Sequence, residues 1–131
     1  MNKTELHQLQ DYLRGILGNT GLKVTQHAKE DGAADVALGE RKIGKLVVDD
    51  EDGDRSFSFE MKIPVQRPAI EEYLRLLFEN PKLKVMARAK KTDSVELNSG
   101  SDFLGIVSAD DPKGNSYTFQ MAILDYDLEE R

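Results

Sequence analysis

The chain has 131 residues, of which 39% are hydrophobic and 32% charged, and its formal net charge is -6. This composition is typical of one soluble folded domain and is too apolar for a disordered chain. The acidic balance disfavours generic binding to nucleic acid or anionic membranes, because both need clustered Lys and Arg. The absence of cysteine excludes disulfides, thiolate nucleophiles and cysteine-based zinc sites.

The N-terminal segment 1–19 is amphipathic and charged, and it lacks the apolar region of a signal peptide. No stretch approaches the roughly 20 apolar residues that a membrane span needs. We therefore expect a soluble, cytoplasmic protein without a membrane partner.

The sequence contains an internal repeat. Segment 10–29 aligns with segment 71–90 without a gap, at a shift of 61 residues. After a one-residue deletion, segment 56–63 (SFSFEMKI) aligns with segment 116–123 (SYTFQMAI). Chance does not give such a run in one register, so we infer a duplication.

The first copy, residues 1–65, begins with a predicted helix that ends at Gly18. Its apolar residues follow the three-four spacing of one helical face: Leu6, Leu9, Leu13, Ile16 and Leu17. Four predicted strands follow, at 22–28, 34–39, 42–48 and 56–63. Gly39 fits a tight turn, whereas Gly44 lies inside a strand and indicates a bulge or close packing by the helix.

The second copy, residues 66–131, repeats this order. Its helix carries Pro68 in the first turn and an apolar face of Ile70, Leu74, Leu77 and Phe78. Its strands are predicted at 83–89, 94–100, 103–109 and 116–123, with Gly100 and Gly105 in the places of the first copy's glycines. The acidic segment 124–131 is predicted to be an exposed tail or strand end.

The predicted fold class is α+β. Short gaps between strands allow only hairpins, so each copy should form a helix plus a four-stranded antiparallel meander. A copy of about 65 residues is marginal alone. We expect the two copies to pack as one compact unit around a pseudo-twofold axis, joined at 64–68 (PVQRP). The sequence leaves open whether they share one continuous sheet.

The segment 49–56 (DDEDGDRS) raises the possibility of a calcium loop. With Gly53 at position six of an EF-hand loop, Val48 and Phe59 occupy positions one and twelve, where carboxylates are needed. The equivalent segment of the second copy, DDPKGNSY, keeps the Asp, Gly and Ser residues that are typical of turns but has Pro and Lys in place of two of the acids. We interpret both segments as hairpin loops. A weak divalent site at 49–54, unique to the first copy, remains the alternative.

No catalytic constellation is recognisable, so we expect no enzymatic activity, no cofactor and no metal site. His7 and His27 lie in no pattern of known mechanism and are predicted to be surface residues. An enzyme working in a cleft between the copies, with Glu60 or Asp125 as a perturbed carboxylate, is a third possibility.

Basic side chains recur along the first predicted strand of each copy. In the first copy Lys23, His27 and Lys29 are predicted to share one face. The candidate anion-binding residues of both copies are Lys23, Lys29, Lys84, Arg88 and Lys90. Alternatively, these charges pair with Asp35 and Glu96 on the next strand. Nucleic acid is disfavoured as a ligand, because no aromatic residue is interleaved on that face.

The second copy resembles a known family. The segments EEYLRLLFENPKLKVMARAKKTDSVEL, FLGIVSADD and SYTFQMAILDYDLE resemble a short, uncharacterised alphaproteobacterial family, domain of unknown function 3126. The resemblance covers residues 68–130 well and residues 5–63 more loosely. It implies a bacterial source and no activity. Family members are about as long as one copy, so this chain departs by being a tandem, and single-copy relatives are expected to form homodimers.

These observations predict a small non-enzymatic protein-interaction module with an unidentified protein partner. The alternative is anion or nucleic-acid binding through the basic strand face. The chain itself is expected to be a monomer or a homodimer.

Overall fold

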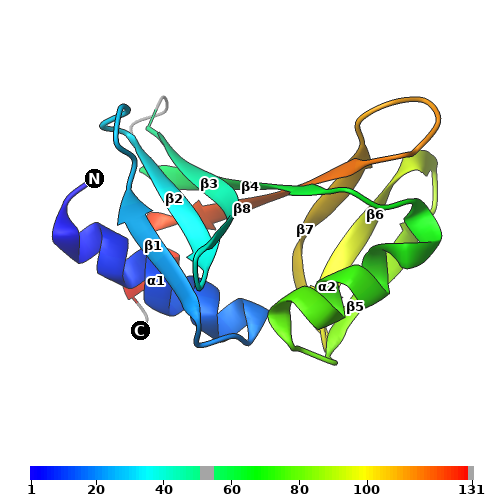
Figure 1. Cartoon of the computed structure of the whole chain (residues 1–131), viewed down its shortest axis with the longest axis horizontal. Helices are drawn as coiled ribbons and strands as arrows, with labels where there is room; N and C mark the ends of the chain where they lie inside the picture. Colours follow the sequence, from blue (N-terminus) through cyan, green and yellow to red (C-terminus); the bar gives the residue numbers. More distant parts are fainter. Residues whose placement is uncertain (51–54, 130–131) are drawn as a thin grey trace.

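One continuous antiparallel sheet of eight strands organises the molecule, in the order β1-β2-β3-β4-β8-β7-β6-β5. The computed structural model describes residues 1–50 and 55–129. At the middle of the sheet, β4 (Ser56–Ile63) and β8 (Tyr117–Leu124) pair along their whole length. These two strands connect the remaining strands of the first copy to those of the second (Figure 1). The two copies therefore share one sheet.

All eight predicted strands are present, and consecutive strands of each copy pair with one another. The other strands are β1 (Leu22–Gln26), β2 (Ala33–Leu38), β3 (Arg41–Asp49), β5 (Leu83–Arg88), β6 (Lys91–Ser99) and β7 (Asp102–Ala109). The helices are α1 (Lys3–Leu17), the 3-10 turn η1 (Arg67–Ala69), α2 (Ile70–Phe78) and α3 (Asp125–Glu129). No helix of the described chain is long and apolar enough to cross a bilayer.

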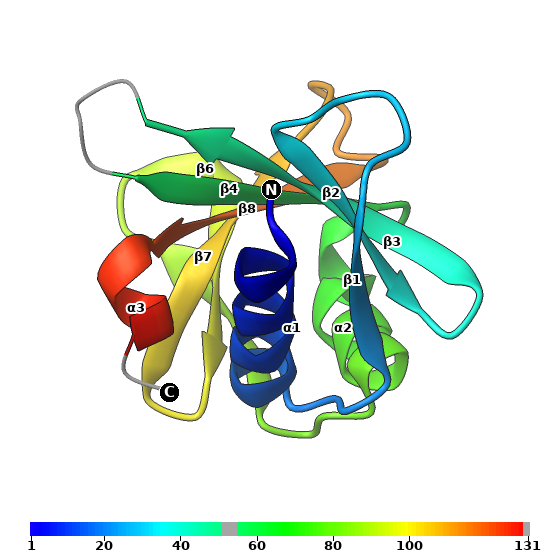
Figure 2. The ribbon, with the colours of Figure 1, turned by 90° about the vertical axis from the view of Figure 1, so that its left-hand side faces the viewer.

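A single hydrophobic core lies between the helices and one face of the sheet. Strict alternation in β4 buries Phe57, Phe59, Met61 and Ile63, and β8 buries their equivalents. These side chains belong to the same core cluster as the buried faces of α1 and α2. Both helices lie on this side of the sheet (Figures 1 and 2), and we call the opposite side the helix-free face.

The C-terminal segment corrects a prediction. Residues expected to form an exposed tail or strand end instead form α3, which packs beside α1 (Figure 2). Leu128 is buried there at 2% exposure. The burial of this one leucine against the core explains why a short acidic stretch is helical.

The C-terminal ends of α1 and α2 meet (Figure 1), which brings together two sets of unpaired carbonyl groups and two negative dipole ends. Two asparagines at equivalent positions each donate a hydrogen bond to a carbonyl at the end of the other copy's helix. Asn19 Nδ2 donates to the carbonyl of Phe78 at 2.8 Å, and Asn80 Nδ2 donates to the carbonyl of Leu17 at 2.9 Å. Gly18 ends α1 at φ 71°, and a Cβ there would lie 2.6 Å from Asn80 Nδ2. The close approach of Asn80 therefore favours glycine at this end of α1, whereas Glu79 takes the equivalent left-handed position at the end of α2, at φ 54°.

Each helix also satisfies backbone groups of the edge strand of its own copy. Arg14 Nε donates to the carbonyl of Leu22 at 2.7 Å, and Gln10 Oε1 accepts from the N–H of Val24 at 3.1 Å. The second copy repeats both contacts, between Arg75 and Leu83 and between Glu71 and Val85. These contacts occupy edge groups that could otherwise pair with another chain.

Asn80→Ala should lower the free energy of unfolding by about 2 kcal/mol, because it leaves the Leu17 carbonyl without its donor at a buried junction. Urea unfolding followed by circular dichroism measures the change. Leu76→Ala is the control, since Leu76 is 71% exposed on α2 and should change stability by no more than about 0.5 kcal/mol. Equal stabilities for Asn80→Ala and the unmodified protein would contradict the role of the junction.

Candidate functional site

The predicted anion-binding residues do not gather in one place. Lys23 lies on β1, but Lys29 lies in the loop beyond it, because β1 ends at Gln26. Lys84 and Arg88 lie on β5, at the opposite edge of the sheet, and Lys90 lies in the turn that follows. The prediction that His27 and Lys29 continue the strand face of Lys23 is therefore wrong.

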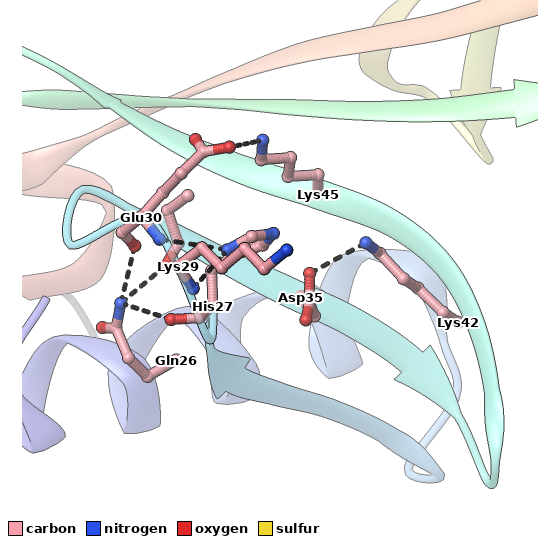
Figure 3. Close-up of polar contacts among 8 residues, drawn as sticks. Gln26, His27, Lys29, Glu30, Asp35, Lys42 and Lys45 are labelled. Atoms are coloured by element: carbon pink, nitrogen blue, oxygen red, sulfur yellow. Dashed lines mark hydrogen bonds and ion pairs between the residues drawn. The ribbon is translucent and has the colours of Figure 1, made fainter.

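The loop after β1 turns because polar side chains hold it (Figure 3). Gln26 Nε2 lies 2.9–3.3 Å from the carbonyl oxygens of His27, Glu30, Asp31 and Ala33. His27 Nδ1 accepts from the backbone N–H groups of Lys29 and Glu30, each at 3.1 Å. These bonds replace strand pairing and carry Lys29 away from the row of Lys23.

Two cations on the helix-free face of the first copy, Lys42 and Lys45, pair with acids of the same copy (Figure 3). Lys42 Nζ lies 3.0 Å from Asp35 Oδ1, and Lys45 Nζ lies 2.8 Å from Glu30 Oε1. The residue opposite Asp35 on β1 is Thr25, and the residue opposite Glu96 on β5 is Met86. The register therefore places neither acid directly opposite a basic residue of the first strand.

Two equivalent clefts open beside the central strands. β3 pairs with β4 only from Gly44 onward, and β7 pairs with β8 only from Ile106 onward. A β-bulge lies close to the start of each of these pairings. Ile43 is an extra residue in the pairing of β3 with β2, and Leu104 is an extra residue in the pairing of β7 with β6. The beginnings of β3 and β7 therefore separate from the sheet centre and leave a cleft on each side.

Close backbone approach fixes the point of separation. A Cβ on Gly105 would lie 2.3 Å from the carbonyl oxygen of Gln120, and a Cβ on Gly44 would lie 2.6 Å from the Phe59 ring. Of the two predicted alternatives, the bulge is confirmed, since the extra residues Ile43 and Leu104 adjoin these glycines, whereas close packing by the helix is wrong, because the close neighbour is a central strand. The positive φ expected at Gly39 and Gly100 is also confirmed, at 61° and 60°.

The two clefts have similar volumes, about 400 Å³ each, but different chemistry. The first cleft is lined by four charged residues: Lys42, Lys45, Glu60 and Lys62. At the equivalent positions the second cleft has uncharged residues: Phe103, Ile106, Gln120 and Ala122. Tyr12 of α1 and Asp127 of α3 complete its lining. Duplication has thus produced two similar clefts with opposite electrostatic character.

Large apolar side chains are exposed beside the second cleft. Phe103 is 59% exposed and Met86 is 51% exposed. Both lie on the helix-free face, where Met86, Glu96 and Ile106 form one row across the strands. We call Met86, Phe103 and Ile106 the β5–β7 patch. Sequence reasoning missed this patch, although aligning the copies sets Phe103 against Lys42.

The candidate divalent site at 49–54 lies partly outside the described residues, since 51–54 are not described. Beside it, Arg55 Nη2 donates to Glu5 Oε1 at 2.9 Å as part of a bidentate ion pair, and Arg55 Nη1 lies 3.7 Å from Asp50 Oδ2. Within the described ranges, no three His, Asp or Glu side chains gather as a metal site.

The equivalent turn of the second copy shows ordinary turn chemistry. Asp110 accepts hydrogen bonds from the hydroxyls of Thr118 at 2.6 Å and Ser116 at 2.9 Å, and these bonds hold the pKa of Asp110 below its usual value. Asp111 accepts from the N–H of Asn115, and Gly114 adopts φ 65°. The hairpin-loop interpretation is confirmed for this copy.

The structure does not bring the remaining candidate residues together. Glu60 lines the first cleft, whereas Asp125 begins α3 and donates its N–H to the carbonyl of Arg55. His7 lies on α1 with Nε2 3.4 Å from Asp11, on an exposed face. His27 belongs to the loop described above. Both histidines are surface residues, as predicted.

The fold is that of a tandem α+β protein in which two copies of one domain share a sheet. The family described as Protein of unknown function (DUF3126) matches residues 5–65 and again residues 68–127. The chain therefore belongs to this family, as a tandem duplication of its domain. No curated protein and no solved structure matches the chain.

The Glu5–Arg55 pair should make stability depend on pH in acid. The hydrogen bond from Arg55 lowers the pKa of Glu5 from its ordinary value of 4.5. The stabilisation is therefore present above that value and is lost as the pH falls through the lowered pKa. Between about pH 5 and about pH 3, Glu5→Gln should lose less stability than the unmodified protein, by about 0.5–1 kcal/mol.

Urea unfolding at several pH values measures this difference. Gln66, which lies at the position equivalent to Glu5, already pairs with Asn115 through an amide, so Glu5→Gln is compatible with the local fold. Glu72→Gln on the exposed side of α2 is the control for loss of one helix carboxylate. Parallel pH profiles for Glu5→Gln and the unmodified protein would show that the pair contributes nothing.

Proposed function

We propose that this chain is a non-enzymatic protein-interaction module in which two copies related by a pseudo-twofold axis form a scaffold and the second copy provides the binding surface. The axis passes between Glu60 and Gln120, which are equivalent residues and pair with each other across β4 and β8. The pairs on either side follow the same symmetry. Phe59 pairs with Met121 and Met61 pairs with Phe119, and each pair becomes the other when every residue is replaced by its equivalent in the other copy.

One observation carries the proposal. Both copies keep the inward residues that build the core, but their helix-free faces differ. The first copy has Thr25 on β1 and Lys42 on β3. At the equivalent positions the second copy exposes Met86 and Phe103. The fold therefore does not require apolar residues at these positions. Large apolar side chains exposed on one face of a protein can mark an interaction surface.

Polar residues of β6 lie between the apolar members of the β5–β7 patch. Lys84 lies opposite Asn98, which in turn lies opposite Phe103. Glu96 lies between Met86 and Ile106. Met86 on one side of β6 and Phe103 with Ile106 on the other are therefore two apolar anchors with polar groups between them, which a partner can bury together. Phe103 and Met86 are the side chains that a partner would bury most.

Exchange of the exposed residues for their first-copy counterparts tests the proposal. The double variant Met86→Thr and Phe103→Lys should fold normally, because the first copy folds with these residues, and it should lose at least about 90% of the partner captured from its own cells. Capture on the tagged full chain, with nuclease present and quantified by mass spectrometry, measures this.

Leu76→Glu is the matched control for this capture, since Leu76 is the most exposed large apolar side chain of α2. It should retain the partner. Loss of the same partner by Leu76→Glu, or its full retention by the double variant, would contradict a binding surface at the β5–β7 patch.

Anion or nucleic-acid binding is a second candidate, favoured by unpaired cations on β5 and its turn. Among the described residues none lies within ion-pair distance of Lys84 or Lys90, whereas Lys42 and Lys45 are paired. Cations that are not neutralised within the protein are available to phosphates. Arg88 is less available, because its Nη1 donates to Ser94 Oγ at 2.7 Å.

Retention on immobilised heparin tests the second candidate. If β5 binds polyanions, the chain should bind at about 50 mM salt, and Lys84→Gln with Lys90→Gln should elute at clearly lower salt. Lys42→Gln with Lys45→Gln removes the same charge from paired positions and should elute later than the β5 variant. Flow-through of the unmodified chain at low salt would eliminate this candidate.

A further inference from the structure

We infer that the second cleft binds a basic side chain, arginine or lysine, carried by an extended segment of the protein partner. This inference rests on the proposed function, since the cleft adjoins the β5–β7 patch. Phe103 and Ile106 belong to both the patch and the cleft lining. A partner that covers the patch therefore also contacts the β7 side of the cleft.

The cleft has the size and walls of a binding site. Its volume of about 400 Å³ falls within the range of roughly 300–1,000 Å³ that ligand sites occupy. Three separate elements contribute to its lining: α1 with Tyr12, β7 with Phe103 and α3 with Asp127. Aromatic faces together with a carboxylate attract an organic cation.

Asp127 is held in position. Its Oδ2 accepts the backbone N–H of Leu124 at 3.0 Å, which fixes the carboxylate near the end of β8. An ionised carboxylate has about four lone-pair sites, so one backbone donor leaves acceptor capacity for a guanidinium or ammonium group. Asp127 is the one charged residue in the described lining of this cleft. The local charge therefore favours a cation.

The first cleft is the internal comparison. Its lining places Lys42, Lys45 and Lys62 where the second cleft has Phe103, Ile106 and Ala122. Each of these lysines is ion-paired, with Asp35, Glu30 or Asp110, so the repulsion that they exert on a basic ligand is reduced but keeps its sign. The two clefts arose from one ancestral sequence and share their backbone plan. Their difference in charge therefore assigns cation binding to the second cleft alone.

An extended segment suits the sheet at this point. On one side, β8 pairs with β4 as far as Leu124. On the other side, its pairing with β7 ends at Gln120, which lies opposite Ile106. The cleft therefore runs along a stretch of β8 that has a strand neighbour on one side alone. Extended peptides are commonly bound beside such stretches, where alternate side chains enter pockets.

Titration of the full, ¹⁵N-labelled chain with four capped tripeptides tests the inference by NMR. The peptides are Leu-Arg-Leu, Leu-Lys-Leu, the neutral isostere Leu-citrulline-Leu and Leu-Glu-Leu. A basic peptide should shift the amide signals of Gly105 and Ala122 and bind about five-fold or more tightly than the citrulline peptide. Equal affinity for the citrulline peptide, or shifts centred on Gly44, would overturn the inference.

Three variants locate the site. Asp127→Asn should weaken the basic peptide about five-fold and leave the citrulline peptide unchanged. Phe103→Lys installs the first-cleft residue at an exposed position and should abolish the preference for the basic peptide. Lys42→Gln removes a charge from the first cleft at a position on β3 that does not pair with β4, and it should leave binding unchanged. A preference that survives Phe103→Lys would also overturn the inference.

The capture experiment separates the two proposals. If the citrulline peptide binds as well as the arginine peptide while Phe103→Lys still loses the captured partner, the cation site is wrong and the interaction surface stands. If the arginine peptide is preferred and its preference depends on Asp127, but Phe103→Lys retains the captured partner, the cation site stands and the proposed surface is wrong.

Discussion

Pairing between β4 and β8 is the interaction on which the rest of the structure depends. Each copy alone has about 65 residues, too few to bury a large core. The central ladder joins the two copies into one sheet and sends the alternating side chains of both strands into one shared core. It also brings the C-terminal ends of the two helices together, where Asn19 and Asn80 each donate to the other copy's helix. The clefts lie on either side of the same ladder.

Local periodicity was enough to predict the elements of this fold. The alternation of Phe57, Phe59, Met61 and Ile63 requires a strand with one buried face, and the helical faces follow equally from spacing. Three features depended on side-chain or strand contacts that the periodicity does not encode. The pairing of β4 with β8 is not encoded in either strand's alternation. The end of β1 depends on loop carbonyls bound by Gln26, and α3 depends on burial of Leu128.

The candidate site was harder to predict for the same reason. Basic residues such as Lys84 are recognisable in the sequence, but their partners and grouping depend on register and loop geometry. An apolar residue in a strand usually indicates the core, so Phe103 and Met86 did not stand out. Only their exposure identifies them. Gly44 and Gly105 indicated a bulge as one alternative, but the clefts beside them were not predicted, because they depend on where the strands separate from β4 and β8, and the sequence does not specify that register.

The difference between the two clefts has an evolutionary consequence. In a dimer of identical chains every substitution occurs twice, so a mutation that improves one cleft for a ligand changes the other equally. Fusion of the two copies into one gene removes that coupling. Lys42 and Phe103 are then separate targets of selection, and one half of the molecule can acquire a new specificity while the other half keeps the ancestral role or only supports the shared sheet. Gene fusion thus converts a symmetric scaffold into one that can evolve two different surfaces.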